Sequence, residues 1–127
     1  MSTSFFERLS LGPIICDGAM GTQLHARSGT LFDQSLDAAN LTKPELVKDI
    51  HLAYLSAGAE MVSTNTFGAN ALKLAPYGHA EQMEAINRAG VLIAKESARL
   101  SGQKARAKRF PSGPTKKISC AIRWQIP

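Results

Sequence analysis

The most regular hydrophobic pattern in the chain lies between residues 43 and 57. Apolar side chains recur there with the 3.6-residue period of an amphipathic helix. They are Leu46, Val47, Ile50, Ala53, Tyr54 and Ala57. Thr42 and Glu45 stand at the spacing of a capping box, and Gly58 is suited to a left-handed stop. The pattern predicts a helix over 43–57 that packs one face on a sheet.

Shorter apolar segments flank this helix. Residues 14–16 are apolar at consecutive positions, which is typical of a parallel strand covered on both faces, and residues 61–64 predict a second short strand. A second helical pattern runs from residue 83 to about residue 100, with Gly102 as its stop. Residues 5–9 predict a short amphipathic turn that plugs an edge of the core. Strands that alternate with helices predict a parallel sheet.

Polar residues gather where the two predicted strands end. Asp17 and Gly18 follow the first strand, and Asn65, Thr66 and Phe67 follow the second. The carboxyl ends of parallel strands meet at one edge of a sheet, with neighbouring strands roughly 5 Å apart. Functional groups collect at this edge in parallel α/β folds. The sequence therefore predicts that Asp17 and Asn65 lie on one rim, on neighbouring strands.

The glycine-rich turn after Asp17 fits more than one chemistry. Phosphate binding is not favoured, because the spacing is not that of a phosphate-binding loop and a carboxylate repels a phosphate. Asp17 suits an α-amino group, while N–H groups from Gly18 onward suit a carboxylate, which together would clamp an amino acid. Alternatively, Asp17 caps the following turn and the glycines adopt left-handed backbone angles. The residues alone leave these last two interpretations open.

The second strand end is equally open to two interpretations. Asn65 and Thr66 offer an amide and a hydroxyl that suit the orientation of a ligand, and Phe67 offers an apolar wall. A turn filled by bonds from side chains to backbone explains the same residue types.

The composition does not favour a membrane protein. The 127 residues are 44% hydrophobic and 20% charged, as in one soluble globular domain, and no apolar run is long enough to cross a bilayer. Because the N-terminus lacks the features of a signal peptide, a cytoplasmic location is expected.

The histidines and cysteines do not predict a metal site. His25, His51 and His79 lack the spacing of metal ligands and are expected on helix surfaces or in loops. Cys16 and Cys120 are expected to be free thiols, with Cys16 buried and inert. No catalytic or metal-binding residue is therefore assigned.

Charge divides the chain near residue 101. Residues 1–100 carry eight Lys or Arg against ten Asp or Glu, whereas residues 101–127 carry seven Lys or Arg and no acid. We expect a globular part over 1–100 and a basic, poorly ordered tail over 101–127, solvated from residue 102 to 117. Residues 118–124 alternate like an added edge strand. Nucleic-acid binding is not favoured, because no recognition module surrounds the tail's two aromatic residues.

Three segments in order resemble the homocysteine S-methyltransferase family. They are CDGAMGTQL at 16–24, NLTKPELVKDIHLAYLSAGAE at 40–60 and STNTFGAN at 63–70, and the resemblance covers about residues 5 to 100. It implies a TIM (β/α)₈ barrel with a catalytic zinc, which takes the homocysteine thiol as a thiolate that attacks an activated methyl group.

The resemblance also implies roles for the rim residues. Asp17 and Gly18 would hold the amino-acid part of homocysteine, and Asn65, Thr66 and Phe67 would line the same pocket. Three cysteines bind zinc in the family, in Gly-x-Asn-Cys and Gly-Gly-Cys-Cys segments, and the two cysteines of this chain match neither.

The length limits what this chain can form. A TIM barrel needs about 250 residues, so the expected α/β fold is an incomplete barrel made of the first two βα units, with a divergent basic C-terminal tail. We expect the N-terminal portion of a homocysteine S-methyltransferase, truncated or frame-shifted, that alone binds no zinc and transfers no methyl group. A non-catalytic amino-acid-binding module and an interaction protein with a basic tail remain alternatives. The methyl donor is not indicated.

Overall fold

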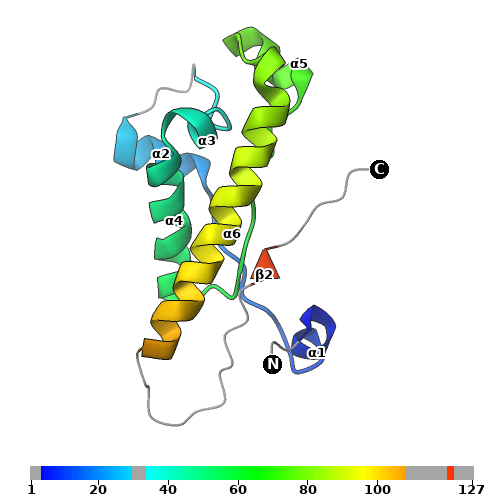
Figure 1. The fold of residues 1–127 in the computed structure, drawn as a ribbon, viewed down its shortest axis with the longest axis vertical. Coiled ribbons are helices and arrows are strands. Elements are labelled where there is room, and N and C mark those ends of the chain that lie inside the picture. The colour runs from blue at the N-terminus through cyan, green and yellow to red at the C-terminus, as the bar shows by residue number, and fades with distance from the viewer. Residues whose placement is uncertain (1–3, 30–33, 108–119, 122–127) are drawn as a thin grey trace.

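The computed structural model describes residues 4–29, 34–107 and 120–121 (Figure 1). This part of the chain is mostly helical, with a short parallel sheet. In chain order the elements are α1 (Phe5–Leu9), α2 (Gly21–Ser28), α3 (Ala39–Thr42), α4 (Pro44–Ala57), β1 (Met61–Val62), α5 (Ala71–Leu74), η1 (Ala75–Tyr77), η2 (Ala80–Gln82), α6 (Met83–Ala107) and β2 (Cys120–Ala121). Within these residues no helix is both long and apolar enough to cross a membrane.

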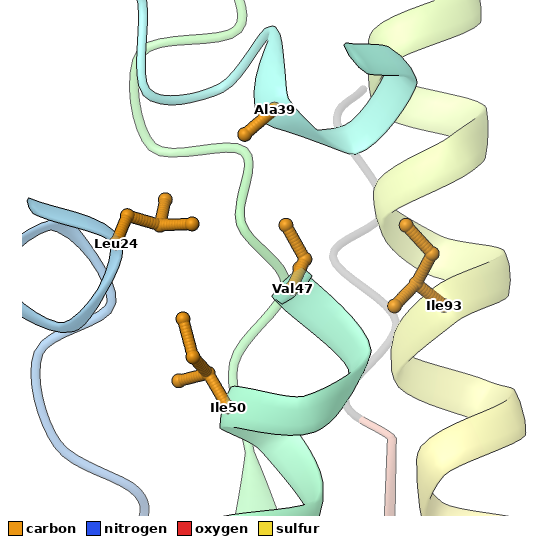
Figure 2. Packing of buried hydrophobic residues seen from close by; sticks show 5 residues of the cluster. All are labelled: Leu24, Ala39, Val47, Ile50 and Ile93. Carbon is orange, nitrogen blue, oxygen red and sulfur yellow. The ribbon is translucent and has the colours of Figure 1, made fainter. Parts of the chain in front are cut away.

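The main core forms where α4 packs between α2 and α6 (Figure 1). Figure 2 shows Val47 and Ile50 of α4 facing Leu24 of α2 and Ile93 of α6, with Ala39 of α3 at the end of the cluster. Val47 and Ile50 are fully buried, as the helical pattern predicts. Burial of such a side chain contributes about 1.5–3 kcal/mol, so this cluster fixes α4 in the fold.

The predicted end of α4 is confirmed, but its predicted cap is wrong. Gly58 stops the helix with a left-handed φ of 119°. Lys43 is the N-cap residue, and no side chain caps the helix. Thr42 is instead the last residue of α3, where its hydroxyl donates to the Ala38 carbonyl at 3.2 Å. Because the preceding helix uses Thr42, its hydroxyl does not serve α4.

His51 is also placed differently from the prediction. Its ring is fully buried in α4, not at a helix surface. One helical turn away on either side lie Val47 and Leu55, which are buried as well. Because residues four apart share a helix face, the position of His51 on the packed face carries it into the interior.

The strands are parallel, as predicted. Met61 pairs with Cys120 in β2 on one side and forms a single bridge with Cys16 on the other. The first predicted strand is therefore reduced to one bridge. Its expected cover on both faces is wrong, since Ile15 is 61% exposed and Cys16 is exposed as well. Helix α4 packs against β1.

Residues 5–9 form the predicted turn of helix, but they do not plug the core. Phe6 is 78% exposed and no residue of α1 is buried. Its N-terminus carries a capping box in which the Ser4 hydroxyl accepts from the Glu7 N–H and the Glu7 carboxylate accepts from the Ser4 N–H. An ion pair between Arg8 and Glu60, at 2.7 Å, links this helix to the residue before β1.

Helix α6 continues beyond its predicted end. It passes through Gly102 and ends at Ala107. A glycine inside a helix costs only about 1 kcal/mol, and the following Lys, Ala and Arg residues favour helix. The solvated segment expected from residue 102 is thus helical up to residue 107. Residues 108–119 and 122–127 lie outside the described residues, and the division of the chain at residue 100 stays a prediction.

Candidate functional site

Asp17 stands at the end of the first strand, where the sequence places it. Its backbone N–H donates to the Met61 carbonyl at 2.9 Å and continues the parallel pairing. Both carboxylate oxygens accept from the backbone N–H of Ser63, at 3.1 and 3.0 Å. The two strand ends are therefore joined directly, because the side chain of one binds the backbone of the other.

The electrostatic environment of Asp17 is unusual for a carboxylate near the surface. Burial raises its pKa above the ordinary value, and this effect outweighs the hydrogen bonds from Ser63, which lower it. Among the described residues no Lys, Arg or His forms an ion pair with Asp17. A partly buried carboxylate without a cationic partner is a favourable site for a positively charged ligand group.

The glycines after Asp17 allow close packing. A Cβ atom on Gly18 would lie 2.9 Å from the Tyr54 hydroxyl oxygen, and one on Gly21 would lie 2.9 Å from Leu36 Cδ1. Neither glycine has a positive φ, so the interpretation that these glycines serve left-handed angles is wrong. The capping interpretation is wrong as well, because Met20 is the N-cap of α2 and no side chain caps it.

Asn65 is buried within a network of amides. Its Nδ2 donates to the Leu36 carbonyl at 2.9 Å and to Asn40 Oδ1 at 3.1 Å. Asn40 Nδ2 in turn donates to the carbonyls of Asn65, at 2.7 Å, and Ile86, at 3.1 Å. The amide group of Asn65 therefore braces the loop after β1 against α3, while Asn40 also reaches α6.

The other residues at the second strand end lie nearer the surface. The Thr66 hydroxyl is 2.7 Å from that of Thr64. Phe67 is 93% exposed, and the Lys73 ammonium lies 4.8 Å from the centre of its ring. The Gly68 N–H donates to Asp37 Oδ1 at 2.9 Å. Of the five candidate residues, Asp17 and Gly18 stand together at the first strand end, whereas Asn65, which is expected on the same rim as Asp17, points into the fold.

Sequence reasoning missed three contributors to this region. Ser63 acts mainly through its backbone N–H, which a pattern of side chains does not indicate, and its side chain also lowers the pKa of Asp17. Asn40 has partners 25 and 46 positions away in the chain, so no local pattern signals it. The helical pattern places Tyr54 on the apolar face of its helix. Its hydroxyl was the available signal, because the polar end of a partly buried tyrosine usually finds a hydrogen-bond partner.

Comparison with protein families decides the lineage of this arrangement. The family model described as homocysteine S-methyltransferase matches residues 14–121, which spans the first strand, the core helices, β1 and β2. The chain belongs to the homocysteine S-methyltransferase family. The match confirms the resemblance in the three segments and extends it past residue 100.

Individual relatives of this methyltransferase-family chain agree with that assignment. Methionine synthases from Mycobacterium leprae and Mycobacterium tuberculosis are 38% and 39% identical to it over 101 residues, which cover 76% of this chain and 8% of each relative. The crystal structure of the homocysteine methyltransferase MmuM from Escherichia coli, in a metallated form, matches with a TM-score of 0.69 and 30% identity. That match covers 78% of this chain and 35% of MmuM, so the fold is similar to part of a homocysteine methyltransferase barrel.

The family implies zinc, and the described residues do not fit such a site. None of their His, Cys, Asp or Glu side chains form a group of three that could hold a metal ion. Cys16, which is exposed, has no second cysteine beside it in the part of the chain described with side chains. No step of the reaction is therefore assigned to a metal held by these residues.

Proposed function

We propose that this homocysteine S-methyltransferase segment supplies the grip on the amino-acid part of homocysteine. The Asp17 carboxylate receives the α-amino group, and backbone N–H groups of the turn that begins at Gly18 receive the carboxylate. The thiol is left free to accept a methyl group, which gives methionine. The observation that carries the proposal is the partly buried Asp17 carboxylate, which lacks a cationic partner in the described residues.

The chemistry of the carboxylate supports an amine ligand. Ser63 donates one N–H to its two oxygens, so each oxygen has capacity for a further hydrogen bond. An ammonium group at that position would offset the cost of burying the charge and would form charge-assisted hydrogen bonds. Because burial raises the pKa of Asp17, the grip should weaken as pH falls toward that pKa and the carboxylate becomes neutral.

The fold proposal follows from the same rim. We assign the segment to the first βα units of a TIM barrel, in which the strand ends face the reaction. The similarity to MmuM and the parallel order of Cys16, Met61 and Cys120 support this assignment. The exposed Phe67 and the partly buried Thr66, in the loop after β1, complete the proposed ligand-facing residues, whereas Asn65 contributes by bracing its loop.

Calorimetric titration of the full chain with L-homocysteine tests the proposal. The Asp17→Asn variant keeps the size and an acceptor for the Ser63 N–H but removes the charge. A charge-assisted hydrogen bond contributes about 1.5–3 kcal/mol, so the affinity should fall by about tenfold or more. Asp49→Asn on the exposed face of α4 is the matched control and should leave the affinity unchanged.

A second ligand locates the effect at the amino group. The analogue 4-mercaptobutanoate keeps the thiol and the carboxylate but lacks the amine, so its affinity should be equal for the unaltered protein and Asp17→Asn. The proposal is wrong if Asp17→Asn binds homocysteine as tightly as the unaltered protein does, or if the two ligands lose affinity equally.

A further inference from the structure

We infer that Tyr54 is a positioning residue for the ligand-binding turn, an inference that rests on the proposed function. Tyr54 lies on α4 and is partly buried against the main core cluster. Its hydroxyl donates to the Ala19 carbonyl at 2.9 Å, across 35 positions of the chain. The helix that carries the core residues Val47 and Ile50 therefore holds the turn that follows Asp17.

The hydrogen bond fixes the direction of one peptide group. The C=O of Ala19 and the N–H of Met20 belong to the same planar trans peptide and point in opposite directions. Because the carbonyl points to Tyr54, the Met20 N–H points away from α4. Among the described residues no acceptor receives this N–H. Tyr54 thereby keeps a backbone donor free beside Asp17, where the ligand carboxylate is proposed to bind.

The absence of a side chain at Gly18 is part of the same arrangement. A Cβ atom there would lie 2.9, 3.0 and 3.2 Å from the hydroxyl oxygen, Cε1 and Cζ of Tyr54. Real Cβ contacts are rarely this short, so any larger residue would push the phenol away from the Ala19 carbonyl. Gly18 and Tyr54 are thus a matched pair, and both act on the orientation of the turn.

The test separates Tyr54 from Asp17 by comparing two ligands. L-Homocysteine carries a thiol, an amine and a carboxylate, whereas 3-aminopropane-1-thiol lacks the carboxylate. Tyr54→Phe removes only the hydroxyl and should weaken homocysteine binding by about threefold to tenfold, the range of one neutral hydrogen bond. Its affinity for 3-aminopropane-1-thiol should not change. Asp17→Asn, in contrast, should weaken both ligands.

Two further variants complete the comparison. Gly18→Ala should reproduce the selective loss of Tyr54→Phe, since the added methyl group displaces the same hydroxyl. Tyr77→Phe, at a partly exposed tyrosine of η1, is the control and should bind both ligands normally. Equal losses for the two ligands in Tyr54→Phe, or unchanged homocysteine affinity, would overturn the inference.

A readout without ligand keeps the two proposals distinguishable. In amide NMR spectra of the full chain, Tyr54→Phe should shift the Met20 resonance, because the Ala19 carbonyl of the same peptide group loses its hydrogen bond, and Tyr77→Phe should not. If the unaltered protein fails to bind homocysteine, the proposed function is wrong, and a changed Met20 amide still supports the hold of Tyr54 on the turn. An unchanged Met20 amide would overturn that hold whatever the ligand result.

Discussion

His51 shows how strongly position in the fold governs a single residue. Its ring is fully buried, and neither ring nitrogen has a hydrogen-bond partner among the described residues. Desolvation by burial lowers its pKa from 6.5 to about 4. A buried polar group without a partner costs about 1–3 kcal/mol, so His51 is tolerated in the core as a neutral imidazole and opposes folding once it is protonated.

This burial predicts a pH dependence of stability. Between the unfolded pKa of 6.5 and the folded value of about 4, the unfolded chain binds more protons. The free energy of unfolding should therefore fall as pH drops through this window, by about 3 kcal/mol from His51. Urea denaturation at several pH values between 7 and 4 measures it.

His51→Leu provides the comparison for this window. It should raise stability at neutral pH and flatten the pH profile between 6.5 and 4, whereas the partly exposed His79→Leu should keep the profile of the unaltered chain. A His51→Leu profile parallel to that of the unaltered protein would show that another group titrates there.

The residues of the site differ in how far the sequence could predict them. Asp17 was predictable, because a charge directly after an apolar strand has a definite place in a parallel sheet. The burial of Asn65 was not, since it depends on Asn40 and Leu36, which reach it only in the folded chain. Its amide suits a ligand and a loop brace equally well, and only the tertiary contacts distinguish the two.

At the scale of elements, Gly90 sets the distance between α6 and the rest of the fold. A Cβ atom there would lie 2.7 Å from both Asn40 Nδ2 and Thr66 Cγ2. Helix α6 therefore passes directly over α3 and the loop after β1, and the amide network of Asn40 fits against its bare backbone.

Substitution of this glycine should reverse the usual preference for alanine in helices. Gly90→Ala gains helix propensity but overpacks the contact, and overpacking typically costs about 1–3 kcal/mol. Gly102→Ala, at an exposed position of the same helix, should stabilise by up to about 1 kcal/mol. Thermal and urea unfolding of the two variants compare them. Equal stabilisation in both would mean that α6 can move away from Asn40 at little cost.

The bounds of a helix or strand could be predicted from the sequence where several local features agreed. Helix α4 was found within one residue because its period, Pro44 and Gly58 agree with one another. The first predicted strand is present only as a single bridge at Cys16, because a run of three apolar residues does not specify which elements pack on a strand. Helix α6 extends past its predicted end at Gly102, because a single glycine does not stop a helix when the residues around it favour helix.

At the scale of the whole molecule, Arg8 joins segments that are distant in sequence. Its Nε and Nη2 donate to the two oxygens of Glu60 at 2.8 and 2.7 Å. The same guanidinium donates to the carbonyls of Gly12 and Pro13, at 3.3 and 3.0 Å. One side chain thus holds α1, the approach to the first strand and the residue before β1.

A double-mutant cycle tests this link. Arg8→Ala and Glu60→Ala should each lower the free energy of unfolding, and the double variant should lose less than the sum of the two losses. Arg88→Ala breaks the exposed pair with Glu84 and is the control, with a smaller expected effect. Strictly additive losses at Arg8 and Glu60 would mean that their contact does not stabilise the fold.

The same guanidinium also has a consequence for alignment. Parallel strands have no hairpin between them to fix which residue stands opposite which, and a slip by one position would turn the side chains of a strand to the other face. Arg8 aligns the starts of the two strands, because its guanidinium group binds both the Glu60 carboxylate and the Pro13 carbonyl. The backbone hydrogen bonds between Glu60 and Ile15 and between Asp17 and Met61 continue this alignment along the strands. The distance between Asp17 and Ser63, at the carboxyl ends of the strands, is thus set in part at the opposite end of the sheet.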